Sequence, residues 1–213
     1  MTVADNLASV VERIERTDRD PDEVTIVAVT KGFGKDVCAQ ALHAGLRILG
    51  ENRVQEAIPK VEAFPDATWH LIGHLQSNKV APAVKHFAMI QTVDSLRLAE
   101  AIARADDEIP VLIEVNISRE PQRTGADPAT ALEFIHDAAR ILNVQGLMGM
   151  GPAGADPTPA FKELHHLHRD AQERLGRMLP ILSMGMSSDF EVAVRCGSTM
   201  VRLGEALFGP RPH

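Results

Sequence analysis

The sequence predicts an α/β fold, a single (β/α)8 TIM barrel preceded by an extra N-terminal helix. Eight short apolar runs recur along the chain, each followed by polar residues and a helix-like segment. Alternating strands and helices form a parallel sheet, and runs that are apolar throughout suit strands buried on both faces. Eight repeats favour a closed barrel over an open doubly wound sheet, although the 213 residues fall below the ~250 typical of such barrels.

The elements are assigned from these runs and the segments between them. Strands are expected at 24–30, 46–50, 69–73, 88–93, 110–117, 144–148, 181–184 and 200–203. Helices are expected at 35–44, 54–64, 78–86, 95–104, 128–142, 158–178 and 188–196, with a short last helix after Gly204 and an amphipathic first helix at 3–16. The stretch 149–159, rich in glycine and proline, is interpreted as a loop inside one domain that spans residues 1–213.

Composition and charge exclude several classes of protein. No apolar run approaches the ~20 residues needed to cross a bilayer, and the N-terminus lacks the pattern of a signal peptide, so we expect a cytoplasmic protein without a membrane partner. The net charge of −7 and the lack of a basic stripe argue against nucleic-acid binding. Cys38 and Cys196 lie far apart, so neither a disulfide framework nor a cysteine zinc site is expected.

The candidate site lies where the strands of such a barrel end, at their carboxyl termini. Lys31 directly follows the first expected strand, which places its amine at a partly desolvated barrel mouth. Desolvation favours a neutral amine, the form that attacks an aldehyde to give a Schiff base. The alternative is a strand-end lysine that extends to solvent.

The last two strand–helix units carry glycine and hydroxyl residues, in the segments 185–189 and 197–204. Glycines let the backbone approach an anion, and phosphate sites in these barrels often use the last two loops. Ordinary turns and helix caps are the alternative. Arg202, within the last strand, would either face a ring nitrogen of a ligand or pair with a carboxylate such as Glu114.

Histidines and methionines are two further groups of candidate site residues. His165 and His168 share a helical face, but no cysteine or acidic pair completes a ligand set, so we expect surface histidines and no metal site. The methionines at 148, 150, 184 and 186 are expected to fill the barrel.

Several motifs occur in one order over nearly the whole chain: AVTK at 28–31, GENRVQEA at 50–57, WHLIGHLQSNK at 69–79, EVNIS at 114–118, GLMGM at 146–150 and the long segment 182–209. Together they resemble the pyridoxal phosphate homeostasis proteins, a family related to the N-terminal barrel of alanine racemase. Gly32, Phe33 and Gly34 depart from the family pattern after the lysine, which suggests a more mobile first loop.

The resemblance implies a barrel that binds pyridoxal 5'-phosphate (PLP) as a Schiff base on Lys31. Asn52 and His70 would neighbour the cofactor, and Arg202 would face the pyridine nitrogen. Hydroxyls and amides of the last two units would hold the phosphate. The complete expected cofactor-binding set is Lys31, Asn52, His70, Met184, Ser187, Ser198, Thr199, Arg202 and Gly204.

The resemblance also implies a function in PLP homeostasis, in which the protein buffers the cofactor and delivers it to apo-enzymes without catalytic residues of its own. The alternative is a PLP-dependent enzyme with weak amino-acid racemase activity. A two-base racemase of the related kind needs a tyrosine from a second domain, and this chain contains no tyrosine. A barrel that binds another phosphorylated ligand without a Schiff base is a third possibility. We expect a monomer.

Overall fold

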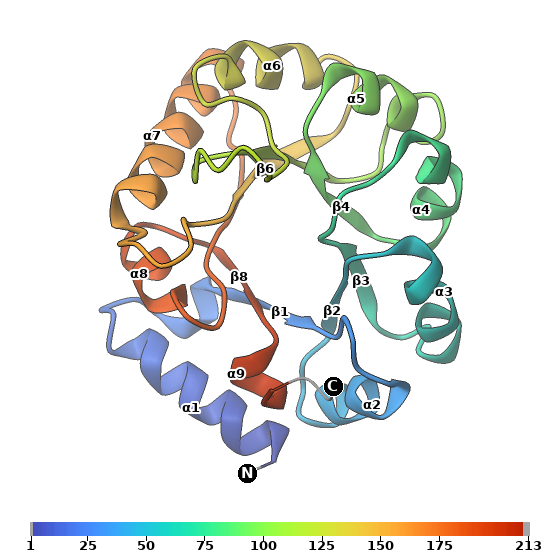
Figure 1. The fold of residues 1–213 in the computed structure, drawn as a ribbon, viewed down its shortest axis with the longest axis vertical. Coiled ribbons are helices and arrows are strands. Elements are labelled where there is room, and N and C mark those ends of the chain that lie inside the picture. The colour runs from blue at the N-terminus through green and yellow to red at the C-terminus, as the bar shows by residue number, and fades with distance from the viewer. Residues whose placement is uncertain (1, 211–213) are drawn as a thin grey trace.

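Eight parallel strands close into a barrel in which neighbours in sequence are neighbours in space, and β8 pairs with β1 (Figure 1). This computed structural model describes residues 2–210. The strands are β1 (Thr25–Val29), β2 (Ile48–Glu51), β3 (Thr68–Leu71), β4 (Met89–Val93), β5 (Val111–Val115), β6 (Val144–Gly149), β7 (Ile181–Ser183) and β8 (Met200–Leu203). The predicted (β/α)8 barrel is therefore confirmed, including the place of all eight strands.

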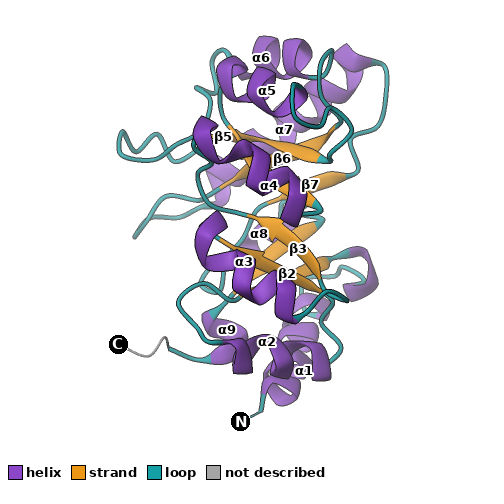
Figure 2. Cartoon of the chain, turned by 90° about the vertical axis from the view of Figure 1, so that its right-hand side faces the viewer, coloured by secondary structure: helices purple, strands orange, loops and turns teal. Residues whose placement is uncertain are grey.

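Helices surround the barrel and connect its strands (Figures 1 and 2). They are α1 (Val3–Glu15), α2 (Lys35–His43), α3 (Val54–Ala63), α4 (Val80–His86), α5 (Leu96–Ala103), α6 (Ala131–Ala138), α7 (Thr158–Leu175), α8 (Phe190–Arg195) and α9 (Glu205–Phe208), with 3-10 turns η1 (Pro21–Glu23) and η2 (Ser77–Lys79). No helix among residues 2–210 combines the length and the apolar character that crossing a bilayer requires.

Most helices end within two residues of the predicted bounds, and two differ by three residues or more. The helix expected at 128–142 is α6, which spans only Ala131–Ala138. It begins late because a turn occupies the residues before it, in which the Asp127 carboxylate accepts the amide of Ala129. The helix expected at 158–178 ends at Leu175, because Gly176 adopts a left-handed conformation with φ of 63°, a common helix terminator.

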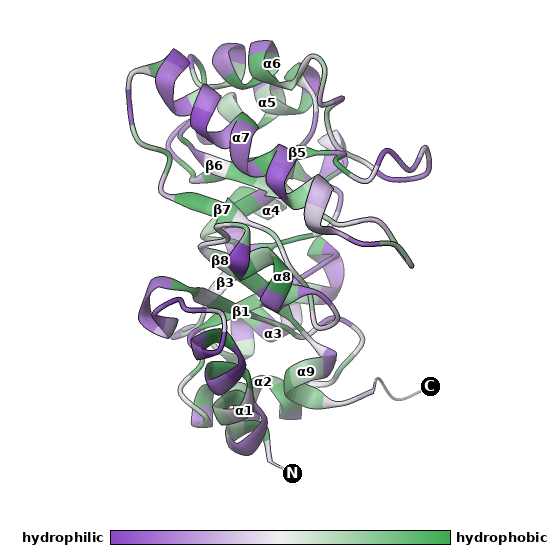
Figure 3. Ribbon diagram, turned by 90° about the vertical axis from the view of Figure 1, so that its left-hand side faces the viewer, coloured by the Kyte–Doolittle hydropathy of each residue, from purple (hydrophilic) through white to green (hydrophobic). Residues whose placement is uncertain are grey.

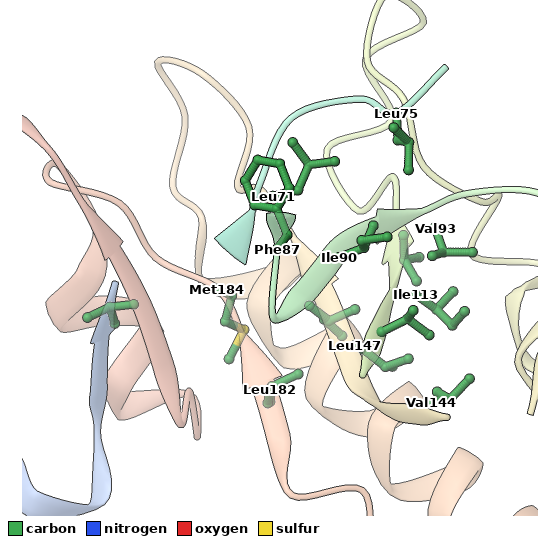
Figure 4. Packing of buried hydrophobic residues seen from close by; sticks show 14 of the residues in the cluster. Leu71, Leu75, Phe87, Ile90, Val93, Ile113, Val144, Leu147, Leu182 and Met184 are labelled. Atoms are coloured by element: carbon green, nitrogen blue, oxygen red, sulfur yellow. The ribbon is translucent and has the colours of Figure 1, made fainter. Parts of the chain in front are cut away.

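The main hydrophobic core lies between the strands and the ring of helices. Figure 4 shows Leu71, Ile90, Ile113 and Leu147 from neighbouring strands packed in this layer. The helices carry hydrophilic residues on their outer faces, as Figure 3 shows for α1 and α7. Burial of this layer supplies most of the driving force for folding, at roughly 25 cal/mol per Å² of apolar surface.

The inside of the barrel is different, because apolar and polar side chains share it: Met89, Leu112 and Met148 form a small apolar cluster, and Val29 and Ile72 line the open end. Buried polar side chains, such as Gln91 on β4 and Glu114 on β5, come from the same strands as this cluster and from others. Typical barrels of this class fill their interior with branched aliphatic residues. The polar interior therefore has to be satisfied by internal hydrogen bonds.

The extra N-terminal helix is fixed to the last part of the chain. Arg13 makes two hydrogen bonds, of 3.1 and 3.0 Å, to the carboxylate of Glu191 on α8. Asn6 donates from its side chain to the carbonyl of Leu207 on α9 at 2.8 Å. Helix α1 therefore supports the two helices that follow β7 and β8, at the end of the barrel where the site was predicted.

Candidate functional site

A cavity of about 390 Å³ opens at the carboxyl ends of the strands, and every strand or the loop after it contributes to its wall. Five of the predicted residues line it: Lys31, Asn52, Ser187, Arg202 and Gly204. They come from the first, second, seventh and eighth units of the chain. Closure of the barrel brings them together although up to 173 positions (204 − 31) separate them in sequence.

The residue before Lys31 is held by a buried ion pair. Lys60 on α3 bonds a carboxylate oxygen of Glu51 at 2.6 Å and the carbonyl of Thr30 at 2.8 Å. The hydroxyl of Thr30 donates to the same Glu51 oxygen at 2.7 Å. Glu51 is fully buried, and Lys60 is nearly so. Both the side chain and the backbone of Thr30 are therefore anchored immediately before Lys31.

Asn52 enters the cavity from the end of β2, one residue after Glu51. Its side-chain oxygen is buried and has no hydrogen-bond partner among the described residues. The next loop passes very close to it, since a Cβ atom on Gly73 would collide with the Asn52 carbonyl oxygen. Thr92 fixes that loop by donating its hydroxyl to the Gly73 carbonyl at 2.8 Å. Asn52 thus offers a fixed acceptor to a ligand.

Ser187 joins the loops that follow β7 and β8. Its oxygen accepts the backbone amides of Gly204, at 3.3 Å, and of Ala206, at 3.0 Å. Because a hydroxyl oxygen can accept two bonds while it donates one, the Ser187 hydrogen can point to an oxygen of a ligand. Ser188 and Gly204 line the cavity beside it.

Arg202 is only 5% exposed and lies at the base of the cavity. One of its terminal nitrogens donates to the Ser183 carbonyl and hydroxyl, at 2.9 and 2.7 Å, and the other donates to the Gly149 carbonyl at 3.1 Å. Burial lowers the pKa of Arg202 to about 10, which leaves it protonated at neutral pH. It therefore places a fixed positive charge below the cavity.

Glu114 faces the same cavity and is a residue that the sequence offered only as an ion-pair partner of Arg202. It is 2% exposed, and Thr124 donates its hydroxyl to one carboxyl oxygen at 3.0 Å. The other oxygen is buried without a hydrogen-bond partner among the described residues. Burial raises the pKa of the Glu114 carboxyl, although Thr124 and Arg202 oppose the shift.

The other four predicted residues do not line this cavity. His70 and Thr199 border a depression at the opposite, amino-terminal end of the barrel. Ser198 is buried with its oxygen within hydrogen-bond distance of the carbonyls of residues 182, 184 and 200. Met184 lies in the hydrophobic core (Figure 4). Ser198 and Thr199 lie in the segment that joins β7 to β8, immediately before the first residue of β8, and the Thr199 hydroxyl oxygen accepts the Leu182 amide.

The histidine prediction requires one correction. His168 is buried, and its Nε2 atom lies 2.8 Å from the carbonyl oxygen of Leu179. It is not a solvated surface residue, because the face of α7 that carries it packs against the barrel. His165 is half-buried, and its Nδ1 atom is buried without a hydrogen-bond partner among the described residues, so it is only partly the surface residue that was expected.

The fold and the cavity define a barrel of the alanine racemase type, and the family model "Alanine racemase, N-terminal domain" matches residues 3–212. Pyridoxal phosphate homeostasis proteins of Aquifex aeolicus and Escherichia coli are each 36% identical to the chain; the alignments cover 100% and 99% of it, and 100% and 97% of those proteins. The chain belongs to the pyridoxal phosphate homeostasis protein family.

Solved structures agree with this assignment. The structure of PipY of Synechococcus elongatus without PLP is 37% identical with a TM-score of 0.87 over 98% of this chain and 100% of that one. PipY with PLP bound is 36% identical with a TM-score of 0.85, at the same coverage. Alanine racemase of Corynebacterium glutamicum shares the fold, with a TM-score of 0.78 at 16% identity over 99% of this chain and 60% of its own.

Proposed function

We propose that this chain binds PLP in the cavity at the carboxyl ends of its strands and serves in PLP homeostasis. The observation that carries the proposal is the convergence of Lys31, Ser187 and Arg202 on one cavity. The names of the relatives, and the structure of PipY with PLP bound, support the same ligand.

The residues present fit the chemical groups of PLP. The cofactor supplies an aldehyde that bonds amines reversibly, and Lys31 is the amine that lines the cavity. Ser187 and the backbone near Gly204 would hold the phosphate, which favours hydroxyl and amide donors. Arg202 would lie at the pyridine nitrogen, where a fixed cation discourages ring protonation.

We further propose a carrier that buffers PLP and passes it to apo-enzymes in the cytoplasm, without turnover of its own. The chain contains no tyrosine, so the two-base chemistry of the related racemases would lack one of its bases. The direct test mixes the PLP-loaded protein with an apo-enzyme and follows recovery of that enzyme's activity. If activity recovers no faster than PLP dissociates from the protein into solution, direct delivery is contradicted. Steady racemisation of an amino acid by the loaded protein would contradict the proposal that it is a carrier without turnover.

The binding site is tested by borohydride reduction after mixing with PLP, followed by peptide mass mapping. A single phosphopyridoxyl label on the Lys31 peptide is expected. Lys31→Ala should lose the label and keep the far-ultraviolet circular dichroism of the wild type. Lys35→Ala, which removes an exposed lysine four residues away, is the matched control and should keep the label. Labels scattered over surface lysines, or a label that persists in Lys31→Ala, would contradict the assignment of Lys31 as the residue that bonds PLP.

A further inference from the structure

A chain of buried hydrogen bonds crosses the polar interior of the barrel. Its centre is Gln91 on β4, which is fully buried. The Gln91 amide nitrogen lies 3.0 Å from Nδ1 of His70 on β3 and 3.2 Å from the sulfur of Met200 on β8. The Gln91 carbonyl oxygen accepts the hydroxyl of Ser183 on β7 at 2.8 Å. One side chain thus connects three other strands across the inside of the barrel.

The chain continues from Ser183 to the cavity. The Ser183 oxygen accepts a hydrogen bond of 2.7 Å from Arg202 while its hydrogen is donated to Gln91. A serine in the middle of such a chain has one donor to give, so these two bonds fix its orientation. The sequence of donors runs from Arg202 through Ser183 to Gln91, and from Gln91 to His70.

His70 ends the chain as an acceptor. It is 4% exposed, and burial lowers the pKa of its imidazole to about 4, so the ring is neutral at physiological pH. A neutral imidazole that accepts at Nδ1 carries its proton on Nε2. The other side of His70 borders the depression at the amino-terminal end of the barrel. The hydrogen-bonded chain therefore extends from that end to the base of the cavity.

We propose that Gln91 and His70 are positioning residues that hold the Arg202 guanidinium at the base of the cavity, although neither touches the cavity itself. Gly149 holds one terminal nitrogen of Arg202 from β6, and Ser183 holds the other from β7. The bonds to the Ser183 and Gly149 carbonyls are made to the backbone, whereas the bond to the Ser183 hydroxyl is made to a side chain. Of these contacts, the hydroxyl bond is therefore the one that a substitution of a neighbouring side chain can change. Without Gln91, the Ser183 hydroxyl loses its acceptor and can rotate away from Arg202.

The proposal rests on the proposed function, since its consequence is read on bound PLP. Gln91→Leu should weaken PLP binding by about tenfold, which corresponds to ~1.4 kcal/mol, because the Arg202 guanidinium loses the hydroxyl that fixes one of its nitrogens. The absorbance maximum of the bound cofactor should shift as well, because the cation near its ring moves. Ser183→Ala should shift affinity and spectrum in the same direction, and provides the milder truncation if Gln91→Leu folds poorly.

A pair of matched histidine variants separates positioning from general stability. His70→Leu should shift the PLP spectrum and affinity in the same direction as Gln91→Leu. His168→Leu also removes a buried, hydrogen-bonded histidine, but on α7 outside the barrel, and should lower thermal stability without moving the spectrum. A spectrum and an affinity that remain those of the wild type in folded Gln91→Leu and Ser183→Ala would overturn the proposal.

The hydrogen-bonded chain of Arg202, Ser183, Gln91 and His70 can be tested without PLP, by measuring the nitrogen chemical shifts of the His70 ring. The wild type should show a proton on Nε2 and an unprotonated Nδ1, and Gln91→Leu should show a mixture of both tautomers. A proton on Nδ1 in the wild type would overturn the proposed direction of the chain. If the wild type took up no PLP, the proposed function would fail while this measurement still reported on the hydrogen bonds.

Discussion

The ion pair of Lys60 and Glu51 gives the sharpest stability prediction, because both charges are withdrawn from water. The exposed fractions of the two side chains are 11% and 1%, and one ammonium bonds both the carboxylate and the Thr30 carbonyl. Lys60→Met keeps most of the side-chain volume and leaves a buried carboxylate whose remaining partner is the Thr30 hydroxyl. Breaking a buried pair by removing one partner costs about 3–5 kcal/mol.

That loss is a large part of the ~5–15 kcal/mol by which domains are stable. The loss in free energy of unfolding can be measured by urea unfolding, followed by the fluorescence of Trp69. Trp69 is buried and is the single tryptophan of the sequence. The melting temperature should fall by roughly 6–20 °C, from 2–4 °C per kcal/mol for a chain of this size. Labelling of Lys31 by PLP and borohydride should slow in the same variant, because the Thr30 carbonyl loses its bond to Lys60.

Two controls make the result decisive. Arg16→Met breaks an exposed pair with Glu12 on α1 and should leave the urea midpoint unchanged. The double variant Lys60→Met with Glu51→Gln should be more stable than Lys60→Met alone, since no uncompensated charge is left in the core. An unchanged midpoint in Lys60→Met, or strictly additive losses in the double variant, would refute the assignment of the cost to a stranded carboxylate.

Three further predictions concern the barrel interior. Because the pKa of His70 is lowered to about 4 in the folded protein, the unfolded chain binds its proton first as the pH falls; stability should decline from pH 6.5 to pH 4 by about 3 kcal/mol, and His70→Leu should flatten that slope. Because burial raises the pKa of Glu114, the contribution of this carboxyl to stability falls as the pH rises. Glu114→Gln should therefore have a higher melting temperature than the wild type at pH 7. A difference in melting temperature that does not shrink towards pH 4 would argue against the buried charge as its cause. Arg202→Ala should weaken PLP binding and shift its spectrum, with Arg202→Lys intermediate because lysine keeps the charge without the planar fork; wild-type binding and spectrum in Arg202→Ala would place the guanidinium away from the ring.

The order and type of the helices and strands can be predicted from the amino-acid sequence alone. Apolar runs mark all eight strands, and the spacing between them gives the alternation of a parallel barrel. The sequence also places Lys31 at the end of β1 and glycine and hydroxyl residues after β7, because those assignments depend only on where a strand stops. Helix ends were less accurate where a local turn at Asp127 competed with helix formation.

The depth at which each side chain lies in the barrel follows from the three-dimensional arrangement of the strands and not from the sequence pattern. Side chains two residues apart on a strand share a face but differ in height by roughly 6–7 Å, so Ile72 reaches the cavity while His70 faces the opposite end. Successive side chains point to opposite faces, which sends Asn52 into the cavity and Glu51 towards Lys60 on α3.

The contacts across the barrel were also beyond the sequence. The chain from His70 through Gln91 and Ser183 to Arg202 joins four strands, and its members meet only because the sheet closes on itself in one register. Periodicity reports which residues are buried, but a hydrogen bond between strands depends on the tilt and stagger of the closed barrel. For this protein the amino-acid sequence thus predicts the barrel and the place of Lys31, whereas the contacts within the site depend on how the sheet closes.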